Sequence, residues 1–363
     1  MKRVLFIAHV ESHILHFHLP FLKIFQDNGY ETHVTTNGKE IIPYCNIQHN
    51  ICFERSPLNI NNIKAFHELR KLLNETEFDI IHCHTPVGGV LGRLAWAHSK
   101  NKEIAKIFYT AHGFHFYNKS SSFNWLLYYP IEKYLAKYTD VLLTINEEDY
   151  TNAQQFHLHN NGKVYKINGV GIDINAIDKI VVNPVSVRAA LRLSLNDVVL
   201  ITVGELNKNK NQEMILKAMQ RSNNPNLKLL ICGKGKYETK LQRLIHDLKL
   251  QNQVFMLGYR TDIIELLKIA DVFVFPSHRE GLSVAAMQAI ACNKICFLSE
   301  IRGNIDLNVY GSNIYYFDEN KPEELTQLLN QIQNIKIKPR TDKIMELDIH
   351  NIISEMKNIY GLK

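Results

Sequence analysis

Short apolar runs and amphipathic stretches alternate along the first half of the chain. Residues 3–9 and 78–83 are apolar runs of strand length, whereas residues 62–74 repeat apolar side chains with helical spacing. A His-rich loop is expected after the first strand, and then an amphipathic helix that ends near residue 28. The same pattern predicts further strands at residues 30–36, 104–110, 140–145 and 164–167, and further helices at residues 88–100, 125–138 and 147–157. Such alternation predicts a parallel sheet with helices on both faces.

The second half of the chain repeats this alternation. Strands are predicted at residues 198–203, 227–232, 254–257, 271–275 and 294–298, and helices at residues 211–220, 237–248, 261–269, 283–291, 322–333 and 342–360. Between the halves, residues 168–173 contain two glycines that can absorb backbone rotation, so this segment is the expected linker. The fold class is therefore α/β, with two Rossmann-like, doubly wound domains at residues 1–170 and 171–340 and a last helical segment at residues 341–363.

Two doubly wound domains joined by a glycine linker are expected to face each other across a cleft. Open α/β sheets bind their ligands beyond the carboxyl ends of the strands. The residues that directly follow each strand are therefore the first candidates for binding and catalysis.

Composition limits the possible partners. The chain has 363 residues, of which 45% are hydrophobic and 21% charged, as in a soluble globular protein of two domains. Its net charge of +6 is scattered and favours anionic partners such as nucleotide diphosphates, but not nucleic acid, which would need a concentrated basic block. The six cysteines form no Cys-x-x-Cys pair, and no apolar run approaches the roughly 20 residues of a membrane span. We expect a cytoplasmic chain with reduced thiols and only peripheral membrane contact.

The segment around residue 280 carries the clearest chemistry. A buried strand is predicted to end at residue 275, a short polar loop with Glu280 follows, and a helix begins near Ser283. A helix N-terminus presents backbone N–H groups that suit a diphosphate, here around Gly281, Leu282 and Ser283. Glu280 is placed to accept hydrogen bonds from sugar hydroxyls, although a carboxylate that caps the helix would occupy the same position.

Two loops that follow other strands of the second half can also contact a phosphate. Lys208 and Lys210 follow its first strand and can neutralise a diphosphate, unless they only form a solvated charged loop. The Gly-x-Gly turn that begins at Gly233 can bring the backbone close to a phosphate, but a tight strand-to-helix turn has the same sequence.

These segments resemble the donor site of retaining GT-B glycosyltransferases of family 4, which use nucleotide sugars. In that family two glutamates bracket seven residues, and this chain has Glu280 at the first position and Gln288 at the second. The family's Gly-Arg pair and the lysine five residues after the arginine correspond to Gly204, Glu205 and Lys210. The resemblance implies that Glu280 binds the donor sugar and that Gln288 contacts the ribose with a neutral, weaker hydrogen bond.

The resemblance covers most of the chain and implies a reaction. A hexose or N-acetylhexosamine would pass from a UDP-sugar in the C-terminal domain to an acceptor in the N-terminal one, with retention at the anomeric carbon. Tyr259 and Arg260 would line the base or the sugar, and the last helix would pack back on the first domain. The residues expected to carry catalysis are Glu280, His112 and Lys210.

Histidines are dense in the first half of the chain. The segment that contains His13, His16 and His18 resembles a family branch associated with bacterial capsule and exopolysaccharide assembly. His112 stands in a Thr-x-His-Gly setting, where the family's histidine reaches the donor sugar. The acceptor is expected to contact the remaining histidines that follow strands, which are His13, His16, His18, His84 and His115.

A metal site is the alternative use of so many histidines. No His-Glu-x-x-His or Cys/His spacing supports zinc, and no Asp-x-Asp pair stands at a strand end to hold a divalent ion. The sequence therefore predicts metal-independent transfer, with no cofactor and with the UDP-sugar as co-substrate.

The acceptor side is marked mainly by aromatic residues. Residues 114–129 are rich in phenylalanine, tyrosine and tryptophan and have lysines nearby, which suits a lipid headgroup region unless these side chains belong to the core. Because the family often acts on lipid-linked acceptors, we expect a glycan or an undecaprenyl-diphosphate-linked acceptor in surface polysaccharide synthesis. Two alternatives stay open: a UDP-N-acetylhexosamine 2-epimerase, and a non-catalytic nucleotide-sugar-binding assembly partner, which Glu205 and Gln288 motivate.

Overall fold

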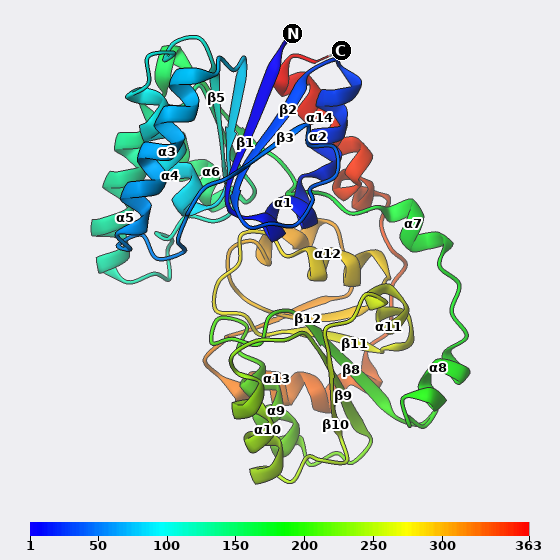
Figure 1. Cartoon of the computed structure of the whole chain (residues 1–363). Helices are drawn as coiled ribbons and strands as arrows, with labels where there is room; N and C mark the ends of the chain where they lie inside the picture. Colours follow the sequence, from blue (N-terminus) through cyan, green and yellow to red (C-terminus); the bar gives the residue numbers. More distant parts are fainter. Residues whose placement is uncertain (363) are drawn as a thin grey trace. The chain divides into compact units, whose positions relative to one another are not determined.

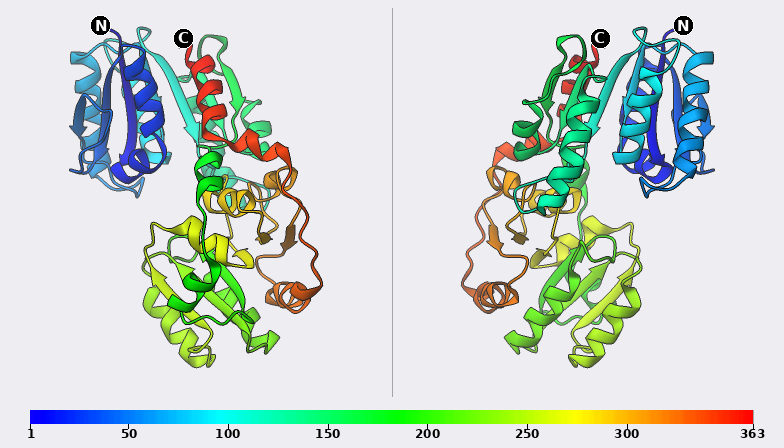
Figure 2. Two further views of the ribbon diagram at one scale, coloured as in Figure 1. Left: turned by 90° about the vertical axis from the view of Figure 1, so that its right-hand side faces the viewer. Right: turned by 90° about the vertical axis from the view of Figure 1, so that its left-hand side faces the viewer.

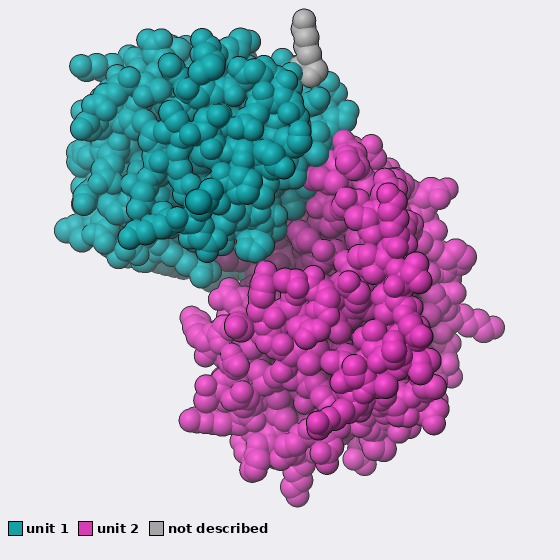
Figure 3. All heavy atoms as spheres, turned by 45° about the vertical axis from the view of Figure 1, so that its right-hand side comes forward, with its two compact units in different colours: residues 1–170, 352–363 teal, residues 171–351 magenta. Residues whose placement is uncertain are grey.

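The computed structural model describes residues 1–362, which divide into two compact units (Figure 3). The first unit comprises residues 1–170 and the end of the chain from residue 352, and the second comprises residues 171–351. The division near residue 170 falls between Gly169 and Gly171, whose φ angles of 73° and 75° strain any residue with a Cβ atom.

The first unit is built on a seven-stranded parallel sheet with the order β3-β2-β1-β4-β5-β6-β7. Its strands are β1 (Arg3–Val10), β2 (Glu31–Asn37), β3 (Ile47–Asn50), β4 (Ile80–Cys83), β5 (Lys106–Ala111), β6 (Val141–Thr144) and β7 (Lys163–Lys166). The inner strands are almost wholly buried because helices cover both faces. The edge strand β3 escaped the sequence prediction because most of its side chains are exposed.

Helices cover both faces of this sheet, and one face is covered by helices from both ends of the chain. The helices on one face include α3 (Asn61–Glu75) and α4 (Pro86–Ala97), and those on the other include α2 (Leu19–Asp27) and α14 (Ile349–Tyr360) (Figure 1). The remaining helices of the unit are α1 (Glu11–Phe17), α5 (Ser122–Ala136), α6 (Glu147–Ala153) and the 3₁₀ turn η1 (His159–Asn161).

The segment after β1 is helical, and the expectation of a His-rich loop there was wrong. Helix α1 follows β1 directly, and α2 begins one residue after α1 ends, with Pro20 in its first turn. Ile14 and His18 are buried and stand four residues apart, which is about one helical turn. The helical spacing could not be recognised from the sequence, because histidine occurs on buried and exposed faces alike.

The second unit contains a six-stranded parallel sheet with the order β10-β9-β8-β11-β12-β13. Its strands are β8 (Val198–Val203), β9 (Leu227–Cys232), β10 (Val254–Gly258), β11 (Val272–Phe275), β12 (Ile295–Ser299) and β13 (Ile314–Phe317). Its helices are α7 (Ile174–Lys179), α8 (Pro184–Ala190), α9 (Gln212–Ser222), α10 (Glu238–Asp247), α11 (Ile263–Ile269), α12 (Val284–Ala291) and α13 (Pro322–Gln331), with 3₁₀ turns η2 (Ile305–Val309), η3 (Ile332–Asn334) and η4 (Asp342–Leu347). Apolar clusters fill both faces of this sheet, as expected for a doubly wound fold.

The end of the chain returns to the first unit through α14. Figure 2 shows this helix, in red, alongside the sheet of that unit. The Tyr360 hydroxyl lies 2.6 Å from His82 Nδ1, and its ring packs against Phe25 with ring centroids 4.7 Å apart. Ile344 and Leu347, which precede α14, are buried in the second unit, so that unit extends beyond residue 340, where the sequence suggested its end.

Two features bear on earlier expectations about thiols and membranes. All six cysteines are free thiols, as the absence of paired spacing suggested. Within residues 1–362, no helix combines the length and the apolar character needed to cross a bilayer.

Candidate functional site

The loop between β11 and α12 has the form that the sequence predicted. Strand β11 is fully buried and ends at Phe275, and α12 begins at Val284. The Ser283 hydroxyl oxygen accepts a hydrogen bond from the backbone N–H of Ala286 and so caps the helix. The remaining N–H groups of the first turn have no acceptor inside the helix, which makes this end a suitable place for an anion.

Lys210 and Glu280 form the centre of this site. Lys210 Nζ donates to Glu280 Oε1 at 2.7 Å and lies 4.6 Å from the centroid of the Phe275 ring. Only 21% of the lysine side chain and 12% of the glutamate side chain are exposed. The two residues therefore place opposite charges in direct contact where water has little access.

Backbone contacts hold the lysine loop against the glutamate loop. The Asn209 side-chain amide donates to the Arg279 carbonyl at 2.9 Å, and the backbone N–H of His278 donates to the Asn209 carbonyl at 2.8 Å. Sequence reasoning did not single out Asn209 or Phe275. A lone asparagine gives no motif signal, and Phe275 reads simply as the end of a buried strand.

The predicted glycines bring two neighbouring loops into close contact. Gly204 follows β8 and Gly233 follows β9, and a Cβ atom on Gly233 would lie 1.9 Å from the Gly204 carbonyl oxygen. The φ angle of Gly233 is 147°, which also disfavours other residues. Gly233 is therefore needed for backbone packing beside Lys210, whether or not it touches a phosphate.

The other predicted donor-site residues are less constrained. Glu205 and Lys208 are exposed at the surface of the lysine loop, and Tyr259 is 62% exposed. Arg260 is already paired with Asp262, since its Nε donates to Asp262 Oδ1 at 2.7 Å.

Around the start of α12, the predicted residues lie together on one short stretch. Gly281 and Leu282 form the half-buried turn into the helix, and Ser283 is its cap. Gln288 lies farther along α12 and is half-buried, and its side chain makes no hydrogen bond within residues 1–362. It is thus free to bond to a ligand.

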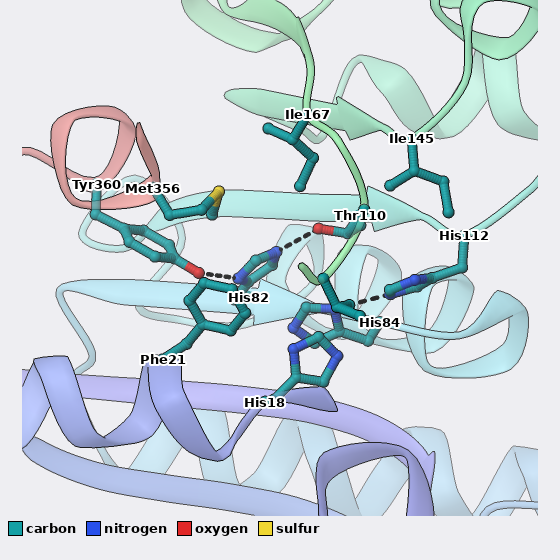
Figure 4. A pocket seen from close by; sticks show the side chains of 12 residues that line it. His18, Phe21, His82, His84, Thr110, His112, Ile145, Ile167, Met356 and Tyr360 are labelled. Carbon is teal, nitrogen blue, oxygen red and sulfur yellow. Dashed lines mark hydrogen bonds between the residues drawn. The ribbon is translucent and has the colours of Figure 1, made fainter. Parts of the chain in front are cut away.

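Four histidines of the first unit converge from different elements. His13 lies on α1, His18 lies between α1 and α2, His84 follows β4, and His112 follows β5. One ring nitrogen of each lies within 4.8 Å of the corresponding atoms of the other three. Figure 4 shows three of them, His18, His84 and His112, pointing toward one another beside a small cavity of about 10 Å³.

Burial keeps these imidazoles neutral. The pKa of His112 is lowered to about 4 because burial disfavours its charged form. Burial, followed by repulsion from neighbouring histidines, lowers the pKa values of His13, His18 and His84 well below 6.5. At pH 7 the cluster therefore offers nitrogen lone pairs and N–H donors, but no positive charge.

Three other histidines of the first unit have different environments. His82 has hydrogen-bond partners at both ring nitrogens, Tyr360 Oη at 2.6 Å and Thr110 Oγ1 at 2.8 Å (Figure 4). His16 is exposed, with Nδ1 lying 2.6 Å from the Ser12 carbonyl. The ring of His115 lies against Tyr128, with centroids 4.7 Å apart. Neither His16 nor His115 belongs to the group of four.

Comparison with known proteins identifies both halves of the chain. Residues 3–146 match the family model described as glycosyl transferase 4-like, and residues 186–344 match the model described as glycosyl transferases group 1. EpsD of Bacillus subtilis (strain 168), a protein named as a glycosyltransferase, is 38% identical over 317 residues, which cover 86% of this chain and 82% of EpsD.

A second relative and a solved structure extend this likeness. The Escherichia coli protein named UDP-Gal:alpha-D-GlcNAc-diphosphoundecaprenol alpha-1,3-galactosyltransferase is 27% identical over 319 residues, covering 82% of this chain and 81% of that protein. The structure of Anabaena HepE in complex with UDP and glucose matches with a TM-score of 0.77 at 16% identity, over 99% of this chain and 100% of HepE. At that identity the match shows the fold alone, and it confirms the predicted GT-B fold class of two Rossmann-like domains. The chain belongs to the glycosyltransferase family, with a glycosyl transferase 4-like region followed by a group 1 region.

Proposed function

We propose that this chain is a retaining glycosyltransferase that moves a hexose or N-acetylhexosamine from a UDP-sugar to a lipid-diphosphate-linked saccharide during surface polysaccharide synthesis. The observation that carries the proposal is the Lys210–Glu280 pair, whose charged atoms lie 2.7 Å apart and whose glutamate stands shortly before the N-terminus of α12. The name of the E. coli relative, which specifies UDP-galactose and a diphosphoundecaprenol-linked acceptor, supports this class of donor and acceptor.

The proposed reaction exchanges one glycosidic bond for another. The bond between the sugar C1 and the UDP oxygen breaks, and a bond forms between C1 and the acceptor hydroxyl oxygen. With retention, the acceptor attacks on the face from which UDP departs, and the hydroxyl proton passes to the departing phosphate oxygen. UDP leaves with the bonding electrons, so negative charge develops on its diphosphate.

Lys210 and the start of α12 are suited to stabilise that charge. Lys210 supplies a cation, and the backbone N–H groups near Leu282 and Ser283 supply donors at the positive end of the helix. These groups take the role that a divalent ion has in other transferases, so we propose that the diphosphate needs no metal. Glu280 accepts hydrogen bonds from the sugar hydroxyls, and in the free protein it balances the charge of Lys210.

We also propose that α5 brings the first unit to the membrane that carries the acceptor. Phe123, Leu126 and Tyr134 are 67%, 78% and 53% exposed and follow one another at helical spacing. Leu127 and Ile131 are also exposed along the helix. Exposed lysines flank this stripe at positions 119, 133 and 137, as expected for a surface that meets anionic lipid headgroups.

Calorimetric titration with UDP and with a panel of UDP- and GDP-sugars, in the presence of EDTA, tests the donor site. We expect saturable binding of a UDP-sugar that is weakened in Glu280→Ala and in Lys210→Met. The matched control is the exposed Lys240–Glu213 ion pair of the same unit, where Lys240→Met should leave binding unchanged. Absence of nucleotide binding in the wild type would remove the donor-site assignment.

Product analysis with and without a lipid-linked acceptor tests the reaction. We expect a new glycolipid with the anomeric configuration of the donor, formed only when acceptor is present. An epimerised donor formed without acceptor would identify a sugar-nucleotide epimerase instead. UDP binding without turnover on any acceptor would indicate a non-catalytic binding protein.

A further inference from the structure

The convergence of His13, His18, His84 and His112 has no explanation in the packing of the first unit. These side chains come from α1, the α1–α2 junction and the ends of β4 and β5. The group consists of histidines alone, with no Asp, Glu or Cys ligand in it. Four imidazoles that face one another in a largely apolar place are costly unless their nitrogens have partners.

Two of the separations between ring nitrogens match those of ligands around a tetrahedral ion. Zinc binds imidazole nitrogen at about 2.0–2.1 Å, which places two ligands of a tetrahedron roughly 3.3–3.4 Å apart. His13 Nε2 lies 3.3 Å from His112 Nε2, and His112 Nε2 lies 3.5 Å from His84 Nδ1. All four ligand atoms lie within 4.8 Å of one another, so the more distant ones must move closer to bind one ion.

Hydrogen bonds between the histidines satisfy this cluster only in part. Within residues 1–362, both ring nitrogens of His18 and the Nε2 atom of His84 are buried without any hydrogen-bond partner. A neutral imidazole carries one donor and one acceptor, so a hydrogen-bond relay would leave His18 wholly unsatisfied. The neighbouring His82 is a contrast, because a tyrosine and a threonine occupy its two nitrogens.

We propose that His13, His18, His84 and His112 bind one Zn²⁺ ion. Four neutral nitrogen ligands favour zinc and related transition metals over Mg²⁺ and Ca²⁺, which prefer oxygen. The ion ties α1 to the ends of β4 and β5, beside the small cavity that His18, His84 and His112 help to line. This site lies in the first unit and differs from the metal-free diphosphate site proposed in the second unit, so either proposal can fail without the other.

Metal analysis of the full-length chain without an affinity tag tests the proposal. After chelation and dialysis, the protein is loaded with Zn²⁺ alone and its metal content is measured, and a second sample is loaded with Co²⁺. We expect one Zn²⁺ per chain, a tetrahedral Co²⁺ absorption band that Zn²⁺ abolishes, and a higher melting temperature with Zn²⁺. No stoichiometric metal and no Co²⁺ band in the wild type would overturn the proposal.

Two variants and a control separate this site from adventitious binding. His13→Ala and His84→Ala should lose the Co²⁺ band and weaken Zn²⁺ binding by roughly tenfold or more. His13 is only half-buried, so its variant should fold, and its melting temperature in EDTA checks this. The control is His49→Ala, which removes one member of the His33–His49 pair elsewhere in the first unit, where the ring nitrogens are 3.0 Å apart. Equal metal binding by wild type and His13→Ala, or loss only in His49→Ala, would overturn the proposal, as would a crystal structure with water at the four histidines.

Discussion

Lys210 and Glu280 show how one ion pair can prepare a site for an anionic ligand. A lysine that is mostly buried needs a nearby negative charge, and Glu280 supplies it at 2.7 Å. Under the proposed function, the diphosphate of a bound nucleotide sugar would take over the lysine, and the carboxylate would turn to the sugar hydroxyls. The free energy that holds the pair together is thereby exchanged for contacts with the ligand.

Gln288 should limit the affinity for the nucleotide. The family resemblance implies that its amide bonds to a ribose hydroxyl as a neutral partner, and charge-assisted hydrogen bonds are about twice as strong as neutral ones. We therefore expect Gln288→Glu to bind UDP roughly fivefold more tightly, which corresponds to about 1 kcal/mol. Calorimetry with UDP measures this, and Gln242→Glu on the exposed face of α10 controls for the added charge. Unchanged affinity in Gln288→Glu would place residue 288 away from the ribose.

At the scale of the element, α5 has two distinct sides. Trp125, Tyr128 and Tyr129 are half-buried against the core, whereas Phe123 and Leu126 are exposed. The sequence left open whether the aromatic segment belongs to the core or to a lipid-facing surface, and the structure divides it between the core and the exposed face of α5.

The exposed side of α5 should bind anionic vesicles. Leu126→Glu removes apolar area that a bilayer would bury and adds a negative charge near anionic headgroups, so we expect vesicle binding to fall by at least about tenfold. Sedimentation with vesicles of phosphatidylglycerol and phosphatidylethanolamine measures it. Ile63→Glu on α3, where Ile63 is 60% exposed, should bind like the wild type. Equal loss in both variants would point to a general charge effect.

The sequence predicted buried elements well and converging side chains poorly. Inner strands such as Val272–Phe275 are covered on both faces and appear as continuous apolar runs. The contact between the Lys210 loop and the Glu280 loop could be predicted, because both loops follow strands. These strands, β8 and β11, are neighbours in the sheet. The cluster of His13 with His84 and His112 could not be predicted from the sequence. It depends on the order of the strands in the sheet and on the helical form of α1, and no local residue spacing indicates either feature.

At the scale of the whole molecule, the first unit is the one that acid should destabilise. Burial lowers the pKa values of five of its histidines, which are His13, His18, His82, His84 and His112. In the unfolded chain these groups return to about 6.5 and bind protons more readily than in the folded chain. Stability is therefore complete above pH 6.5 and decreases as the pH falls toward the lower folded values.

Urea denaturation at pH 7.5, 6.5 and 5.5, in the presence of EDTA, measures this effect. We expect the midpoint to fall mainly between pH 6.5 and 5.5, where carboxylates are still ionised and histidines account for the change. A midpoint that stays constant down to pH 5.5 would mean that the folded and unfolded chains bind protons equally in this range.

The return of α14 to the first unit affects how the protein is made on the ribosome. Tyr360 covers Phe25 and Phe108 and bonds to His82, all of which are synthesised long before it. The nascent first unit must therefore wait, with this aromatic surface uncovered, while the whole second unit is translated. Its folding can be completed only after translation ends, so a premature stop codon near residue 350 would damage the unit that contains the start of the chain.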